Sequence, residues 1–493
     1  MRRRWSVVLC LAAACAHESQ PAPPAASKPP AAPGQAAAKS TAAAPVAATP
    51  EPALPVPPVP PGVTPAFSVP VESYVLDNGL RVVLSRSTAV PTVTVAVYYH
   101  IGFRIEPRNR TGFAHLFEHM MFQGSENLGK LAFIRLVQSN GGLLNGSTRF
   151  DFTNYFEVVP SNVLEAMLWA EADRMRGLDV TEDNLVNQQG VVKSEVRVNV
   201  LNRPYGGFPW LDMPQLANVN WYNAHNFYGD LTDLDAATLP EVKDFFRTYY
   251  APNNAALVVS GDFDPAQVKT WVSKYFAGIP RAAVPPIPDL AEPRQTEEKF
   301  SEKPDKLAQR PALAFGYHMP PRNSPEFWAM AILDQILVEG RDSRLYQELV
   351  QKRGLTGEVE GGANLLGNQF NYQGPMLWIG YLFFDSDKSA KEIMAAVDAA
   401  IEPVRQAPVD AATLARARIK ARSAYYSDLE RLFGFGRADQ LAALALFDGD
   451  AAAVNRIEPA MLQVTPELIL KTAQEWLRPS NRTVLFIKPG AKP

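Results

Sequence analysis

Apolar residues recur along this chain with two periods, which together predict alternating strands and helices. Every second residue between 93 and 99 is apolar, as in a half-buried strand, and the apolar runs at 257–259 and 484–487 are also typical of strands. The segments 161–175 and 325–337 are typical of helices, the second with Ser324 as its N-cap. This alternation predicts an α+β fold in which each sheet carries helices packed on one face.

The first 68 residues differ in composition from the rest of the chain. Three arginines precede a short apolar stretch that ends in small residues before Cys15, which predicts a secretory signal at 1–15 and resembles a bacterial lipoprotein cleavage site. In that case Cys15 is lipidated, and the alternative is an ordinary signal cleaved near the alanines. Residues 16–68 are rich in proline and alanine, so we expect a flexible linker. The expected location is the bacterial periplasm, with an outer-membrane lipid anchor, or otherwise outside the cell.

Composition excludes several classes of function. A net charge of −3 provides no basic field for nucleic acid. After residue 15, no apolar run approaches the length needed to span a bilayer. Both cysteines, Cys10 and Cys15, lie in the signal segment, which excludes a cysteine nucleophile and a cysteine zinc site from the mature chain.

The predicted helix at 113–122 carries the candidate chemistry. His115 and His119 are one helical turn apart, so both imidazoles can reach one metal ion, and Glu118 could take a proton from a metal-bound water. This order, H-x-x-E-H, is the inverted form of a zinc hydrolase motif. The alternative is a pair of surface histidines with a carboxylate partner, which would stabilise the helix slightly.

A third ligand can be sought on the segment 181–200, a predicted helix with Thr181 as its N-cap. Glu195 lies among apolar neighbours in this segment, so its carboxylate needs a partner. A metal ion is one candidate partner, and an ion pair with Lys193 or Arg197 is the other.

The chain contains an internal repeat. Residues 117–124 (FEHMMFQG) align with 333–340 (LDQILVEG), 216 positions later, and 251–263 resembles 478–490. Two homologous units in tandem explain these matches, and prolines between 285 and 304 mark the break between them. The predicted domains are an N-terminal unit at 69–283, a linker at 284–308 and a C-terminal unit at 309–493. The second unit lacks the metal motif, because its aligned residues are Ala331, Asp334 and Gln335.

Over most of residues 70–490 the chain resembles the pitrilysin, insulysin and mitochondrial processing peptidase family of zinc metallopeptidases. The matching segments include YVLDNGLRVVLS (74–85), GFAHLFEHMMFQGSEN (112–127), NGGLLNGSTRFDFTNY (140–155) and VVKSEVR (191–197). The resemblance implies that one Zn²⁺ per chain is held by His115, His119 and Glu195, with Glu118 as the general base. It also implies that 145–155 is an edge strand on which an extended substrate lies, with contacts from Asn145, Gly146, Ser147 and Thr148.

The chain departs from the family pattern at three positions. Gln188 stands seven residues before Glu195, where the family often has a second glutamate, so we expect tuned activity. Val350 and Gly357 stand where active members often have an arginine and a tyrosine that hold the substrate. Their absence implies that a second polypeptide supplies these groups or that the chain manages without them.

These observations predict a zinc-dependent endopeptidase acting on peptides or unfolded polypeptide segments. The alternative is a non-catalytic or partner-dependent subunit that binds substrate for a two-chain peptidase. A zinc hydrolase of non-peptide esters or amides would share the same site. The length resembles that of family members that work as pairs, so we expect a homodimer or heterodimer with a homologous chain. Contact with a membrane is expected only through the lipid anchor.

Overall fold

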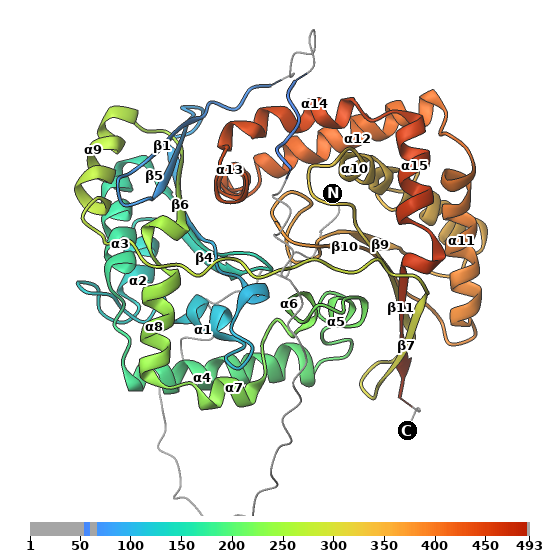
Figure 1. The fold of residues 1–493 in the computed structure, drawn as a ribbon, viewed down its shortest axis with the longest axis horizontal. Helices are drawn as coiled ribbons and strands as arrows, with labels where there is room; N and C mark the ends of the chain where they lie inside the picture. The colour runs from blue at the N-terminus through green and yellow to red at the C-terminus, as the bar shows by residue number, and fades with distance from the viewer. Residues whose placement is uncertain (1–53, 60–66, 491–493) are drawn as a thin grey trace, which may run out of the picture.

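The computed structural model describes residues 54–59 and 67–490, which form two sheets with helices around them (Figure 1). The α+β prediction is confirmed. The predicted signal, Cys15 and most of the 16–68 linker lie outside the described residues. Within the described ranges, no helix is both long enough and apolar enough to cross a bilayer.

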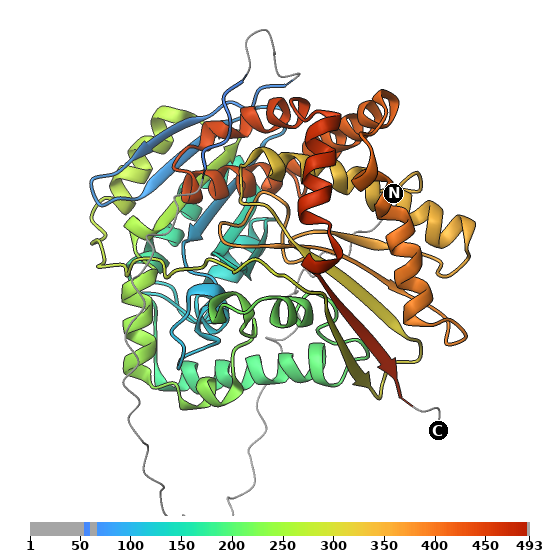
Figure 2. The ribbon, with the colours of Figure 1, turned by 45° about the vertical axis from the view of Figure 1, so that its right-hand side comes forward.

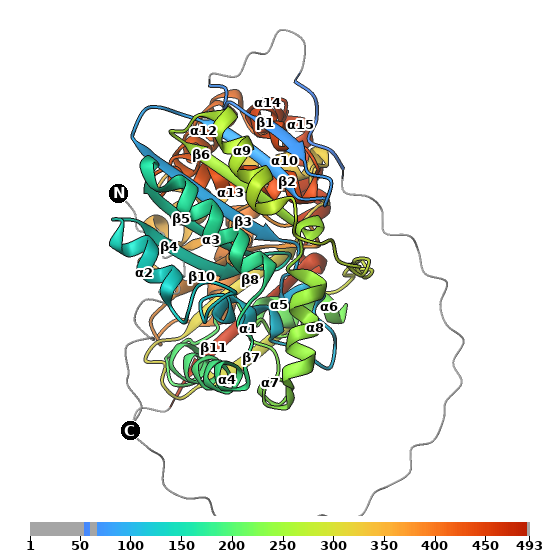
Figure 3. The same cartoon turned by 90° about the vertical axis from the view of Figure 1, so that its left-hand side faces the viewer.

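The two sheets share one topology. The first has the strand order β1-β2-β6-β3-β5-β4 and the second β7-β11-β8-β10-β9, and each contains one parallel pair, β2 with β6 and β7 with β11. The first sheet (Figure 3) consists of β1 (Glu72–Val75), β2 (Arg81–Arg86), β3 (Thr92–Tyr99), β4 (Leu143–Thr148), β5 (Thr153–Pro160) and β6 (Ala255–Gly261). The second (Figure 2) consists of β7 (Lys299–Asp305), β8 (Ala312–His318), β9 (Glu360–Ala363), β10 (Leu377–Phe383) and β11 (Arg482–Pro489). The second sheet therefore repeats the first without a counterpart of β1.

The helices begin where capping residues occur in the sequence. The Thr181 hydroxyl accepts a hydrogen bond from Asn184 N, and the Ser324 hydroxyl accepts one from Phe327 N, as predicted. The first unit contributes α1 (Phe113–Met120), α2 (Ala132–Ser139), α3 (Leu164–Arg176), α4 (Glu182–Val196), α5 (Asp212–Ala217), α6 (Trp221–Ala224), α7 (Leu231–Ala236), α8 (Leu239–Tyr249) and α9 (Pro265–Phe276). The second unit contributes α10 (Pro325–Leu337), α11 (Ala390–Gln406), α12 (Ala411–Leu429), α13 (Phe435–Phe447), α14 (Ile457–Leu462) and α15 (Pro466–Trp476).

Each half of the molecule places one helix against the sheet of the other half. Helix α13 lies against β2, β3 and β6 of the first sheet (Figure 1), and α5 lies against β7, β8 and β11 of the second. The predicted half-burial of residues 93–99 is therefore wrong, because both faces of this strand are covered. Tyr98 packs on the α13 side, while Val95 and Val97 pack on the side of α1 and α3.

Two predicted linkers contain ordered structure. Residues 299–305 of the predicted 284–308 linker form β7, which pairs in parallel with β11 and has one free edge. An edge strand tolerates Pro304, because its missing N–H need not face a neighbouring strand. In the N-terminal linker, Val56 is buried and Asn323 Nδ2 donates to Leu54 O at 2.6 Å. The prediction of a flexible linker is therefore wrong for residues 54–59.

Candidate metal centre

Helix α1 is fixed at its start by a buried carboxylate. Glu106 accepts hydrogen bonds from Ala114 N at 2.5 Å and from Gly112 N at 2.8 Å, and these are N–H groups that the first turn of a helix leaves unpaired. Gly112 has φ 86°, and a Cβ at this position would lie 2.7 Å from Tyr228 O. A glycine is therefore required where the chain enters the helix.

The three side chains predicted to bind zinc converge in the structure. His115 and His119 project from α1 toward Glu195 on α4, and the donor atoms of the three residues lie within 4.8 Å of one another. His115 Nε2 is 3.6 Å from Glu195 Oε1, and His119 Nε2 is 3.2 Å from Glu195 Oε2. Both histidines are buried, so their nitrogens face a closed environment.

This arrangement fits a metal ion. Nε2 of both histidines faces the Glu195 carboxylate, and Nε2 of His119 is buried without a hydrogen bond of favourable geometry, an unpaired state that a metal ion would relieve. Two donors, each about 2.1 Å from a tetrahedral zinc ion, lie about 3.4 Å apart, which is close to the observed separations. Among the described residues, His115, His119 and Glu195 form the one group with spacing suited to a metal.

The electrostatics of the three side chains also suit a cation. Burial lowers the pKa of His115 below its ordinary value, although the nearby Glu195 carboxylate opposes this effect. The neutral imidazole is the form that binds a metal. Burial raises the pKa of Glu195, but its contacts with His119 and His115 outweigh burial and hold the pKa below its ordinary value. The group therefore offers His115 with its neutral form favoured, together with one carboxylate.

Glu118 lies between the histidines and the edge of the first sheet. Its side chain is 3 % exposed, and a Cβ at Gly146 would lie 3.4 Å from Glu118 Cγ. The backbone of β4 therefore passes directly beside this carboxylate. Strand β4 pairs only with β5, so its other edge is free of strand partners in the described sheet.

The edge strand is shorter than predicted. Asn145, Gly146, Ser147 and Thr148 all lie on β4, but residues 153–155 belong to β5, an inner strand of the sheet. The β4–β5 turn separates the two strands. Thr148 Oγ1 donates to Ala114 O at 3.3 Å, which ties the end of β4 to α1.

Gln188 is buried on α4, two turns before Glu195. Two buried acids on α3 have partners other than the imidazoles. Asp173 accepts from Ser125 Oγ at 2.7 Å, and Glu171 pairs with Arg174. Neither therefore orients a histidine.

Two residues of the site were missed by sequence reasoning. The Tyr228 hydroxyl donates to Glu195 Oε1 at 3.3 Å, and its ring contacts that of His115 at a centroid distance of 5.0 Å. Glu106 holds the start of α1, as described above. In the sequence, Tyr228 belongs to an aromatic cluster that is typical of core packing, and no local signal distinguishes it.

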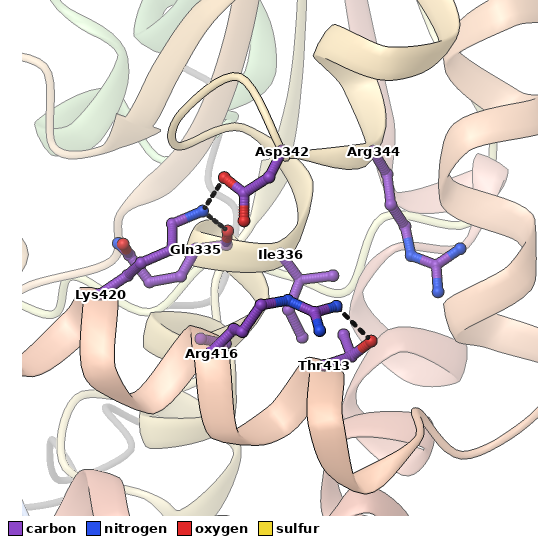
Figure 4. Close-up of a pocket in the computed structure, with 8 residues that line it drawn as sticks. Gln335, Ile336, Asp342, Arg344, Thr413, Arg416 and Lys420 are labelled. Atoms are coloured by element: carbon purple, nitrogen blue, oxygen red, sulfur yellow. Dashed lines mark hydrogen bonds and ion pairs between the residues drawn. The ribbon is translucent and has the colours of Figure 1, made fainter.

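The second unit has a cavity beside the residue aligned with His119. This cavity, of about 190 Å³, is lined by Gln335 at the end of α10 and by Arg416 and Lys420 on α12 (Figure 4). Lys420 Nζ donates to Gln335 O at 2.8 Å and to Asp342 Oδ1 at 2.9 Å. Cationic side chains repel a metal ion, so this cavity does not reproduce the first site.

Comparisons with known proteins cover both units. Residues 81–204 match the family described as insulinase (peptidase family M16), and residues 236–420 match the peptidase M16 inactive domain. Zinc protease PqqE of Helicobacter pylori is 26% identical over 431 residues, which cover 85% of this chain and 93% of that protein. The crystal structure of a protease from Helicobacter pylori is 26% identical with a TM-score of 0.78, covering 86% of this chain and 100% of that chain. The periplasmic protease PqqL from Escherichia coli is 17% identical and similar in fold, with a TM-score of 0.68 over 88% of this chain and 48% of that chain.

Proposed function

Because this chain belongs to the insulinase family of peptidases, M16, we propose that it is a zinc-dependent endopeptidase that hydrolyses peptides or unfolded polypeptide segments. The observation that carries the proposal is the convergence of His115, His119 and Glu195 beside Glu118 and the free edge of β4. The zinc protease relatives agree with this assignment.

In this proposal His115, His119 and Glu195 hold the zinc ion, which supplies Lewis acidity toward water and the scissile carbonyl. Glu118 accepts a proton from the attacking water and passes it to the leaving amine. Strand β4 orients an extended substrate through backbone hydrogen bonds, which place few demands on its sequence. The Tyr228 hydroxyl holds the Glu195 carboxylate in position.

The test is cleavage of a quenched peptide library by the chain without its signal segment, beside Glu118→Gln. The parent protein should lose activity with a chelator and recover it with zinc, while Glu118→Gln should stay inactive and still bind one zinc ion. Equal cleavage by both proteins would refute the role of Glu118. Silence from a zinc-loaded parent would favour the alternative, a scaffold or substrate-binding subunit that depends on a partner.

We also propose that the chain works as a homodimer or heterodimer with a homologous chain. Val350 lies in the helical turn Tyr346–Lys352 and packs against a cluster of buried apolar residues. Around Gly357, no described atom lies within 4 Å of the position of a Cβ. The family's substrate-holding arginine and tyrosine would therefore come from the second chain. Light scattering checks this, and a fully active monomer at micromolar concentration would contradict it.

The proposed location is the periplasm, with Cys15 as a lipid attachment site. Replacing Cys15 by alanine should move the protein from the outer-membrane fraction to the soluble fraction. An unchanged distribution between the two fractions would instead favour ordinary secretion.

A further inference from the structure

We infer that the turn between α12 and α13, residues 431–434, contacts the side chains of a peptide bound along β4, and that Phe433 selects an apolar side chain there. The inference rests on the proposed peptidase function and adds a substrate preference to it. The occupant is an extended peptide, and no other ligand is required.

The turn exposes apolar side chains in a strained backbone. Leu432 and Phe433 have φ 49° and 56°, a left-handed conformation that is unfavourable for residues with a Cβ. Leu432 is nevertheless 43% exposed and Phe433 74% exposed, so burial of their own side chains does not offset the strain. Strained residues that present an apolar surface to solvent are typical of binding sites.

The turn leads into α13 close to the free edge of the first sheet. Helix α13 begins at Phe435, whose ring stacks on Phe156 of β5 at a centroid distance of 3.6 Å. Phe156 is the register partner of Asn145 on β4, so these two side chains share one face of the sheet. Because β5 is the neighbour of the edge strand, the start of α13 lies one strand away from the edge of β4 that a peptide would join.

Glu118 lies on the opposite face of the same strand, since it faces Gly146, the residue after Asn145. A peptide added to β4 points alternate side chains to the two faces. Of the two side chains that flank the scissile bond, one then faces α1 and the other faces the 431–434 turn. The structure thus assigns Phe433 to a subsite next to the cleaved bond.

Contacts of Arg431 and of the first turn of α13 hold the two ends of the turn. Asp439, one turn into α13, accepts from the Tyr98 hydroxyl at 2.7 Å and from Asn368 Nδ2 at 3.1 Å. Arg431 lies 3.8 Å from the same carboxylate. A Cβ at Gly436 would lie 1.7 Å from Asp428 O, so the chain is closely packed where it enters α13. A preorganised apolar contact loses little entropy on binding, and the nearby Arg431 disfavours a basic side chain in the subsite.

The experiment compares quenched peptides that carry either leucine or serine at one position. This position is the residue beside the cleaved bond whose side chain faces the turn. The parent protein should prefer leucine by at least tenfold in kcat/KM. Phe433→Ala should reduce this ratio about fivefold or more, mainly through KM, while Phe433→Leu should keep most of it. Phe300→Ala is the matched control, because Phe300 is 56% exposed on β7, away from β4. An unchanged ratio in Phe433→Ala, with cleavage intact, would overturn the inference.

Binding separates this inference from the proposed function. Fluorescent leucine and serine peptides are titrated into Glu118→Gln protein with and without Phe433→Ala, so no cleavage is needed. A leucine preference that depends on Phe433 supports the inference even where the parent protein cleaves nothing. Sedimentation of each variant is measured as well. If Phe433→Ala converts a dimer to a monomer and leaves peptide preference unchanged, the turn covers a partner chain and the inference is wrong.

Discussion

Helices α1 and α10 occupy equivalent places in the two units. A Cβ at Gly146 on β4 would lie 3.4 Å from Glu118 Cγ, and a Cβ at Gly362 on β9 would lie 3.8 Å from Asp334 Oδ1. Asp334 follows Glu118, and Gly362 follows Gly146, by the same 216 positions that separate the two copies of the sequence repeat. Each unit therefore places a carboxylate from its helix beside a glycine of its edge strand.

The two units differ in how their buried polar atoms are paired. Asp334 accepts from Trp378 Nε1 at 2.8 Å and from Gln335 Nε2 at 3.2 Å. On α1, Nδ1 of His115 and both ring nitrogens of His119 have no hydrogen bond. An unpaired buried polar atom costs about 1–3 kcal/mol. The second unit thus has internal hydrogen bonds at the position where the first unit has a candidate reactive site, and in the first unit a metal ion would pair with Nε2 of His119.

The largest expected effect comes from exchanging the two carboxylates for amides. Glu118→Gln should reduce kcat by roughly 10²–10⁴-fold, because that is what a general base contributes and Gln cannot accept the proton. Asp334→Asn should keep cleavage within about twofold and lower the free energy of unfolding by about 1 kcal/mol. Peptide cleavage and urea unfolding of both variants check this. Comparable loss of activity in both would break the functional distinction between the units.

Zinc content tests the same distinction without an activity assay. His119→Gln should leave almost no zinc on the purified protein, because one of three ligands is lost. Gln335→His should still bind a single zinc ion, because α12 presents Lys420 to this position instead of a carboxylate. Elemental analysis after dialysis measures both. A second zinc ion in Gln335→His would show that the loss of one side chain had silenced the second unit.

A smaller effect is expected from the hydroxyl that holds Glu195. Tyr228→Phe removes this donor and should weaken zinc binding about tenfold, the lower end of what such supporting residues contribute. The matched variant is Tyr425→Phe in the second unit, where the hydroxyl donates to Val454 O at 2.7 Å. That change should lower stability by about 1 kcal/mol and leave zinc affinity unchanged. Competition with a zinc chelator measures the affinities.

Local spacing explains how much of the site the sequence could predict. His115 and His119 converge because residues four apart share a helix face, which needs no tertiary information. The position of Glu195 rested on family resemblance, since 76 residues of chain separate it from His119. Tyr228 could not be found from sequence, because its role depends on how a distant loop packs against α1.

The fold was predicted in class but not in its contacts between the units. Strand β7 was missed because its residues are mostly polar and none of them is fully buried at the sheet edge. Burial of both faces of residues 93–99 depends on α13, which lies more than 300 residues later in the chain. Neither feature leaves a periodic signal within its own segment.

A pH dependence of stability is expected from a histidine at the contact between the two units, away from the metal centre. His318 ends β8, and burial lowers its pKa to about 4, although a hydrogen bond with Ala217 of α5 opposes this. Lys299 and Arg478 add to the lowering. An unfolded histidine has a pKa near ~6.5, so between these values the unfolded chain binds more protons than the folded one.

Stability should therefore be fully present above about pH 6.5 and fall as the pH approaches 4, by on the order of 2–3 kcal/mol from this residue. His318→Gln should flatten that part of the pH dependence, because no proton is taken up at this position. Urea unfolding of the parent protein and of His318→Gln at pH 7, 5.5 and 4.5 measures the difference in stability. Both proteins lose zinc at low pH, so that contribution cancels in the difference. Parallel pH profiles would mean that His318 is already accessible to protons in the folded protein, and that the contact between α5 and the second sheet opens more readily than the metal centre.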